Sequence, residues 1–188
     1  AAGRAPAGWK ATAMTQSDSP KISFIFGGAR SGKTRRALSL AETSGMAPVY
    51  IATGQAFDAE MQDRIDRHKA ERGPQWRTVE APIDLATAIT SNASTETILL
   101  IDCLTLWLSN LTFAQRDISA ETHLLIQALQ DATGPVLVVS NEVGLGIVPE
   151  NALARRFRDD QGRLNQSIAA VADRVEFIAA GLPLTLKG

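Results

Sequence analysis

The residues with the clearest chemical role form one short glycine-rich segment. Residues 27 to 34 read GGARSGKT, which matches the pattern G-x-x-x-x-G-K-[ST] and directly follows the apolar run ISFIF. Glycines let the backbone curl so that its N–H groups point at phosphate oxygens, while a lysine and the positive end of a following helix supply charge. A glycine-rich turn without a ligand is disfavoured, because a strand precedes the segment and a helix follows it. We therefore expect the whole segment to bind nucleotide phosphates, and Thr34 also to bind Mg²⁺: Gly27, Gly28, Ala29, Arg30, Ser31, Gly32, Lys33 and Thr34.

A carboxylate follows another apolar run. The sequence TILLI at residues 97–101 is followed directly by Asp102. An acid at the end of a buried strand beside a phosphate loop is suited to hold Mg²⁺. The alternative is that Asp102 only caps a helix that starts near Leu104. Both roles are compatible with the sequence.

Two further loops follow expected strands. Residues 52–55 read ATGQ, and small residues there either let the backbone approach a ligand or form an ordinary turn. Asn141 and Glu142 begin the glycine-containing loop SNEVGLGIVP. These two polar residues either orient an acceptor hydroxyl or the water shell of a metal, or belong to a hydrogen-bonded loop; their position at a strand's carboxyl end favours function.

Residues 58–72, DAEMQDRIDRHKAER, are expected to form a densely charged helix. Its simplest interpretation is a solvated face with ion pairs between neighbouring turns. His68 shares a face with Met61 and Ile65, with Arg72 one turn further on. A histidine in such a place is usually structural. If it faced a nucleotide phosphate, however, its neutral imidazole would be a competent phosphorus nucleophile.

The elements that must position these residues alternate between strands and helices. Short apolar runs alternate with helix-compatible segments, which predicts repeated βα units and a mostly parallel sheet of about seven strands flanked by helices. We expect strands at 21–26, 48–53, 76–81, 97–102, 135–140, 174–179 and 184–187. We expect helices at 33–43, 58–72, 84–91 and 151–172, and two more within 104–132. Ligands of such sheets bind at the carboxyl ends of the strands.

Composition limits the possible partners and compartments. The chain has 188 residues, 45% of them hydrophobic, and a net charge of −1 with basic and acidic residues interleaved. This pattern predicts no nucleic-acid footprint, and no apolar run is long enough to span a membrane. Cys103 is the only cysteine, which suits a reducing cytoplasm. Residues 1–20 are expected to be a flexible tail, and residues 21–188 a single domain.

Four stretches together resemble one family, the bifunctional adenosylcobinamide kinase / adenosylcobinamide-phosphate guanylyltransferases of late cobalamin biosynthesis. The similarity extends from about Ile22 to Lys187. It is carried by GGARSGKT at 27–34, YIATGQ at 50–55, RIDRHKAERG with WRTVEAP at 64–82, and SNEVGLGIVPENALARRFRDDQGRLNQ at 140–166. The first stretch alone would indicate only a P-loop protein, whereas the last two are specific to this family.

The resemblance implies a RecA-like P-loop core and a two-step enzyme. ATP or GTP phosphorylates adenosylcobinamide; GTP then donates GMP to that phosphate through a guanylylated histidine, releasing pyrophosphate and giving adenosylcobinamide-GDP. The resemblance assigns the histidine to His68, implies Mg²⁺, and implies a homotrimer with active sites at subunit contacts. It places nucleotide contacts on residues 27–34 and on Ala52, Thr53, Gly54, Lys69, Ala70, Glu71, Arg72, Glu80 and Asp102. Whether Asp102 binds the metal or the base is left open.

Two other classes compete with this interpretation. A simple small-molecule P-loop kinase needs no nucleophilic histidine and carries an arginine-rich lid, for which residues 58–72 could be mistaken. A RecA-type regulatory or motor module should expose a polybasic face, which the balanced charge disfavours. Covalent label on the protein after incubation with GTP labelled at the α-phosphate would distinguish the bifunctional cobinamide enzyme from these two classes.

Overall fold

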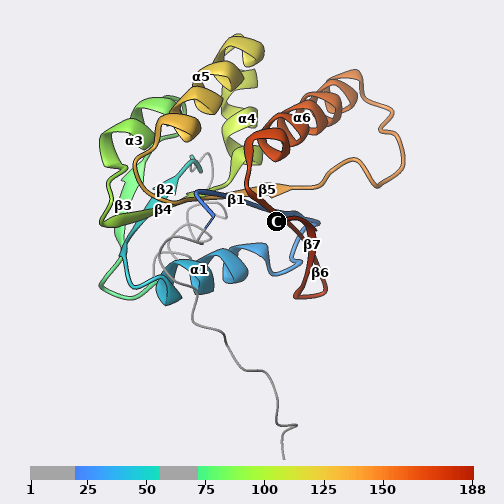
Figure 1. Cartoon of the computed structure of the whole chain (residues 1–188). Coiled ribbons are helices and arrows are strands. Elements are labelled where there is room, and N and C mark those ends of the chain that lie inside the picture. The colour runs from blue at the N-terminus through green and yellow to red at the C-terminus, as the bar shows by residue number, and fades with distance from the viewer. Residues whose placement is uncertain (1–19, 56–71) are drawn as a thin grey trace, which may run out of the picture.

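A computed structural model describes residues 20–55 and 72–188, and this part of the chain contains a seven-stranded sheet (Figure 1). The strand order is β3-β2-β4-β5-β1-β6-β7. All neighbouring strands are parallel except β6 and β7. The strands are β1 (Ile22–Gly27), β2 (Ala47–Ala52), β3 (Arg77–Glu80), β4 (Thr97–Asp102), β5 (Val136–Asn141), β6 (Arg174–Ala179) and β7 (Leu182–Lys187). The predicted mostly parallel sheet is confirmed.

Helices cover both faces of this sheet. The helix α1 (Lys33–Thr43) lies on one face, and the other face is covered by α3 (Leu85–Asn92), α4 (Leu104–Phe113), α5 (Ile118–Asp131) and α6 (Ala152–Val171) (Figure 1). Asp117 and Asn151 cap α5 and α6: the Asp117 side chain accepts two hydrogen bonds from backbone N–H groups of the first turn, and the Asn151 side chain accepts one. The helix expected at 58–72 lies outside the described residues apart from Arg72, which is not helical.

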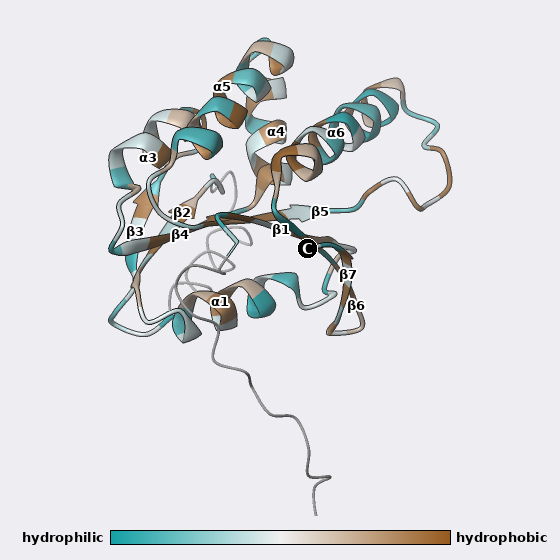
Figure 2. Cartoon of the chain, viewed as in Figure 1, coloured by the Kyte–Doolittle hydropathy of each residue, from teal (hydrophilic) through white to brown (hydrophobic). Residues whose placement is uncertain are grey.

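The central strands are buried on both faces, which explains their continuous apolar sequences. In β4, Leu99 packs into the cluster beneath α3 to α6, while its neighbour Leu100 packs into the cluster beneath α1. Both side chains are fully buried. Brown, hydrophobic colour follows the sheet and the inner sides of the helices in Figure 2, while the outer sides are mostly hydrophilic.

The last strand begins earlier than predicted, at Leu182 instead of Leu184. Ala180 and Gly181 both have positive φ angles, of 51° and 81°. Two such residues form the tight turn that connects antiparallel strands, so pairing resumes directly after them. Pro183 does not prevent this, because β7 is at the edge of the sheet.

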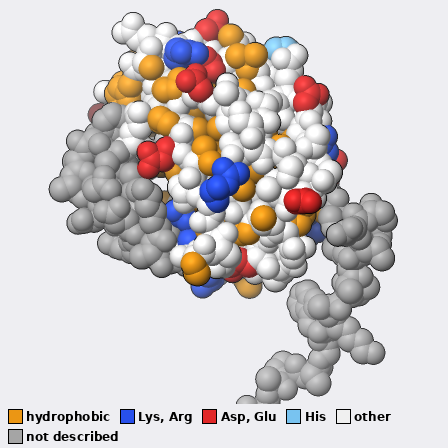
Figure 3. Space-filling view, turned by 90° about the vertical axis from the view of Figure 1, so that its left-hand side faces the viewer, with side chains coloured by type: hydrophobic (Ala, Val, Ile, Leu, Met, Phe, Trp, Pro, Cys, Tyr) orange, Lys and Arg blue, Asp and Glu red, His pale blue; other side chains and the backbone are white. Residues whose placement is uncertain are grey.

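Two further features of the molecule are its surface charge and the character of its helices. On the face shown in Figure 3, Lys and Arg side chains lie next to Asp and Glu side chains without forming a basic stripe. Among the described helices, none combines the length and the apolar character that crossing a bilayer requires.

Candidate active site

The sheet brings several of the expected site residues to one edge. In the strand register, Ala52 at the end of β2 is paired with Glu80 of β3 on one side and with Asp102 of β4 on the other. Gly27, at the end of β1, is paired with Asn141 of β5. Because these strands are parallel, all five residues lie at their carboxyl ends, where ligands of such sheets bind.

The glycine-rich segment forms a compact loop between β1 and α1. A Cβ atom on Gly27 would lie 2.4 Å from the carbonyl oxygen of Ile178, so only glycine fits there. Gly32 has a φ of 98° and directly precedes α1. The loop is also anchored from outside, because the N–H of Glu142 donates to the Gly27 carbonyl (2.9 Å) and the N–H of Gly181 donates to the Ser31 carbonyl (2.8 Å). The loop is therefore preorganised by two other segments of the chain.

Lys33 and Ser31 present unused hydrogen-bonding capacity inside this loop. Lys33 is only 9% exposed, and its Nζ donates to the Gly28 carbonyl at 2.9 Å. Burial lowers the pKa of Lys33, and the nearby Cys103 and Asp102 groups oppose this shift. The hydroxyl of Ser31 is buried without a hydrogen-bond partner in the described part of the chain. A phosphate group fits this arrangement, since it would accept hydrogen bonds from the Ser31 hydroxyl and from the ammonium group.

Asp102 points its carboxylate toward the α1 face rather than capping a helix. Its Oδ2 accepts a hydrogen bond of 3.0 Å from the hydroxyl of Tyr50. The N-cap of α4 is Cys103, and no side-chain hydrogen bond from the described residues caps that helix. The capping alternative for Asp102 is therefore wrong. Its carboxylate remains a candidate for Mg²⁺.

Thr34, in the first turn of α1, and Asp102 are the residues that would hold Mg²⁺. Within residues 20–55 and 72–188, no group of three or more His, Cys, Asp or Glu side chains could hold a metal. A hydroxyl and a carboxylate fit Mg²⁺ nevertheless, because this ion usually takes one or two protein ligands and completes its shell with phosphate oxygens and water.

Thr53 has a structural role that the sequence did not indicate. Its fully buried hydroxyl donates to the Cys103 carbonyl and accepts from the Cys103 N–H, both at 2.8 Å. Asn110 of α4 donates to the Thr53 carbonyl at 2.8 Å. Since the Thr53 side chain is fully used, a nucleotide contact from residues 52–54 would come from the backbone or from the neighbours of Thr53. Burial raises the pKa of the Cys103 thiol to about 12, so this cysteine stays protonated.

Arg72 is the one described residue of the expected 69–72 contact block. It is 9% exposed, and its guanidinium carbon lies 3.6 Å from the centroid of the Tyr50 ring. Its Nε is buried without a hydrogen-bond partner among the described residues. Arg72 therefore keeps an N–H donor that could serve an anionic ligand. His68, Lys69, Ala70 and Glu71 lie outside the described residues, and Glu80 is exposed at the end of β3.

Asn141 and Glu142 rest on a buried polar cluster that sequence reasoning missed. The Ser140 hydroxyl donates to Asn165 Oδ1 at 2.8 Å, and Gln161 Nε2 donates to both of these residues. Asn165 in turn donates to the Asn141 carbonyl at 3.1 Å. The spacing of Gln161 and Asn165 on the apolar face of α6, next to Leu164 and Ile168, was the available signal. This cluster holds the start of the 141–151 loop beside the phosphate-binding loop.

Comparison with known proteins identifies relatives of this chain. A family model described as cobinamide kinase / cobinamide phosphate guanyltransferase matches residues 23–186. The bifunctional adenosylcobalamin biosynthesis protein CobP of Pseudomonas aeruginosa is 49% identical over 167 residues, covering 88% of this chain and 96% of that protein. The bifunctional adenosylcobalamin biosynthesis protein CobU of Salmonella typhimurium is 43% identical over 181 residues, covering 87% and 98%.

Solved structures show the fold alone. A prototypical ATPase from the type III secretion system of pathogenic bacteria superimposes with a TM-score of 0.54 at 9% identity, covering 88% of this chain and 56% of that one. This likeness confirms the predicted P-loop NTPase fold. The family is shown by the match over residues 23–186 and by the two relatives. The chain belongs to the family of bifunctional cobinamide kinases / cobinamide phosphate guanyltransferases.

Proposed function

We propose that this chain phosphorylates adenosylcobinamide with ATP or GTP and then transfers GMP from GTP to the resulting phosphate, giving adenosylcobinamide-GDP and pyrophosphate. The observation that carries this proposal is the single phosphate-binding loop, with Lys33 buried in it and Asp102 at the same sheet edge. One loop would bind the triphosphate in both steps. Phosphoryl transfer depends mainly on positioning and on charge stabilisation, which the loop, Lys33 and Mg²⁺ held by Thr34 and Asp102 would supply.

In the second step His68 is the proposed nucleophile. Its neutral imidazole attacks the α-phosphorus of GTP, a P–N bond forms, and the bond to pyrophosphate breaks. A phosphate oxygen of adenosylcobinamide phosphate then attacks the same phosphorus and releases the imidazole. The intermediate divides one displacement between two anions into two steps. Arg72 supports the proposal, because it is four residues from His68 and its unpartnered Nε is an available donor at the site.

The active unit is proposed to be a homotrimer. The loop between β5 and α6 extends away from the body of the protein and carries a hydrophobic stretch (Figures 1 and 2). Leu145 is 82% exposed and Ile147 is 97% exposed. Val148 and Leu153 are also exposed. Adjacent exposed apolar side chains of this kind are typical of surfaces covered by another protein chain, and this loop starts beside the phosphate-binding loop.

Incubation with GTP labelled at the α-phosphate tests the covalent step. We expect the purified protein to retain label that is labile to acid, stable to alkali, and released as adenosylcobinamide-GDP when adenosylcobinamide phosphate is added. His68→Ala should abolish this label but leave adenosylcobinamide phosphorylation measurable. His123→Ala is the matched control, because His123 is an exposed histidine on α5 and belongs to a different βα unit. Label that survives His68→Ala and disappears with His123→Ala would show that the nucleophile is assigned wrongly.

A further inference from the structure

Tyr50 contacts two groups of the candidate active site at once, and no role follows for it from the sequence or from the family motifs. Its hydroxyl donates to Asp102 Oδ2 at 3.0 Å. The face of its ring lies 3.6 Å from the guanidinium carbon of Arg72. We propose that Tyr50 is a positioning residue that holds the Asp102 carboxylate and the Arg72 guanidinium in place around one nucleotide. This inference rests on the proposed function for the role of Arg72.

The bond to Asp102 follows from the strand register. Tyr50 is paired with Leu100 across β2 and β4, and Asp102 lies two residues beyond Leu100 on the same face of the sheet. Tyr50 is 5% exposed, so its hydroxyl needs a partner inside the protein, and the carboxylate provides it. The hydrogen bond to Oδ2 restricts rotation of the carboxylate and sets the direction in which its other oxygen points.

The ring contact holds Arg72 without using its N–H groups in a strong ion pair. A guanidinium stacked on an aromatic face is attracted by the negative charge of the ring face, and its N–H donors stay at the periphery. Among the described residues, the Arg72 side chain donates a single hydrogen bond, a long one of 3.4 Å to the Thr78 hydroxyl. The Nε therefore remains available for a phosphate oxygen.

Trp76 keeps the Tyr50 ring in this orientation. The two rings pack edge to face, with centroids 6.2 Å apart and an interplanar angle of 79°. The indole Nε1 of Trp76 donates to Glu42 of α1 at 3.2 Å. Trp76 thus links the Tyr50 ring on β2 to α1, the helix that follows the phosphate-binding loop.

Two substitutions separate the two contacts of Tyr50. Tyr50→Phe removes the hydroxyl and keeps the ring, whereas Tyr50→Leu removes both. Leu137→Val is the matched control, since Leu137 belongs to the same apolar cluster but lies on β5, which is separated from β2 by β4. GTP affinity is measured by calorimetry with and without Mg²⁺, and cobinamide phosphorylation is followed as a function of Mg²⁺ concentration. Thermal unfolding of each variant shows whether it folds.

For Tyr50→Phe we expect the gain in GTP affinity caused by Mg²⁺ to shrink by about fivefold or more, with GTP affinity in the absence of Mg²⁺ unchanged. The same substitution in an Asp102→Asn background should have no further effect. For Tyr50→Leu we expect an additional loss of about fivefold in GTP affinity without Mg²⁺, and no such loss in an Arg72→Ala background. Leu137→Val should leave all these quantities near those of the unsubstituted protein.

The proposal is overturned if Tyr50→Phe leaves the Mg²⁺-dependent gain unchanged, or if its effect adds fully to that of Asp102→Asn. If Tyr50→Leu does not fold, the Tyr50→Phe comparison decides the proposal by itself. GTP affinity and cobinamide phosphorylation can be measured whether or not a guanylyl-histidine forms. Absence of covalent label on the unsubstituted protein would therefore contradict the proposed second step, while normal label together with an inert Tyr50→Phe would contradict only the role of Tyr50.

Discussion

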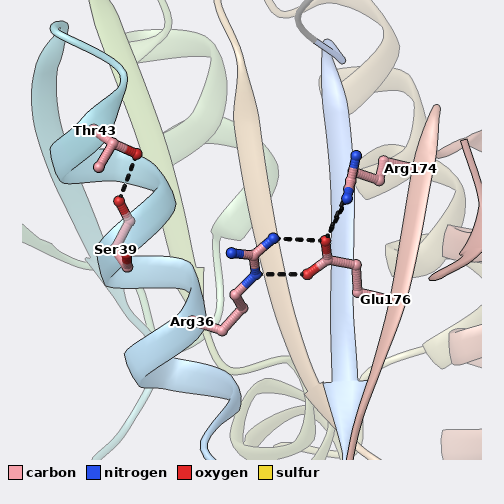
Figure 4. A network of polar contacts seen from close by, with 5 residues as sticks. All are labelled: Arg36, Ser39, Thr43, Arg174 and Glu176. Carbon is pink, nitrogen blue, oxygen red and sulfur yellow. Dashed lines mark hydrogen bonds and ion pairs between the residues drawn. The ribbon is translucent and has the colours of Figure 1, made fainter. Parts of the chain in front are cut away.

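Arg36 and Glu176 are 140 residues apart in the chain, yet two hydrogen bonds of 2.9 Å join the Arg36 guanidinium to the Glu176 carboxylate (Figure 4). Arg174 adds a hydrogen bond of 2.8 Å to Oε1 of the same carboxylate. Glu176 is 1% exposed. Arg36 lies one turn after Lys33 in α1, so this network ties the helix behind the phosphate-binding loop to β6.

The network should make stability depend on pH in the acid range. Hydrogen bonding from Arg36 is the main cause that lowers the pKa of Glu176 below its ordinary 4.5; burial opposes it and Arg174 adds to it. Because the pKa is lower in the folded protein, the stabilisation is fully present above about pH 4.5 and is lost as pH falls through the folded pKa.

We therefore expect Glu176→Gln to lower the free energy of unfolding by about 2 kcal/mol at neutral pH, below the usual value for a buried pair because the arginines are partly exposed. The difference should stay constant between about pH 6 and 8 and shrink below about pH 4.5. Urea unfolding at a series of pH values measures it. A difference that grows toward acid pH would contradict this assignment.

Gly27 and Gly28 are expected to respond differently to the same substitution. Gly27→Ala would place a Cβ atom 2.4 Å from a backbone carbonyl oxygen of β6, which cannot move without disturbing the sheet. At Gly28, no atom lies within 4 Å of such a Cβ atom. We expect Gly27→Ala to lower the midpoint of thermal unfolding by several degrees or more, and Gly28→Ala to change it little. Equal midpoints for the two variants would show that the loop does not pack against Ile178 as described.

Lys33→Ala should suppress both reactions, because one loop would hold the phosphates in each. We expect a loss of about 10²–10³-fold in turnover for phosphorylation and for guanylyl transfer, together with weaker GTP binding. Lys21→Ala is the control, since Lys21 is exposed at the opposite end of β1. Unchanged GTP affinity and turnover in Lys33→Ala would remove the loop from the mechanism.

The exposed apolar loop should control assembly. Ile147→Asp places a charge on a 97% exposed apolar side chain, so it should leave the folded monomer intact while shifting sedimentation from trimer toward monomer. Leu124→Asp is the matched control, because Leu124 is an exposed leucine on α5, far from this loop in the chain. A fully active monomer of the unsubstituted protein at assay concentrations would contradict the proposed trimer.

Much of the fold could be predicted because its signals are local. Apolar runs of five or six residues separated by helix-compatible segments specify parallel βα units. All the expected strands are found within one residue of their predicted ends, apart from β7, which starts two residues earlier than predicted. The phosphate-binding loop is equally local, since its glycines, lysine and threonine are contiguous. Asp102 was proposed as a site residue because it directly ends an apolar strand. Glu80 and Arg72, by contrast, were assigned only through the family resemblance.

By itself the sequence determined which segments are strands, where the phosphate loop lies and which family the motifs resemble. Only the tertiary structure decided the strand order, which places β2 and β3 next to β4 and so aligns Ala52, Glu80 and Asp102. It also decided that Thr53 bonds to Cys103, and that Tyr50 bonds to Asp102 and stacks on Arg72. These contacts join residues of different strands, and they depend on pairing register and on shared burial, which no local pattern of residue types encodes.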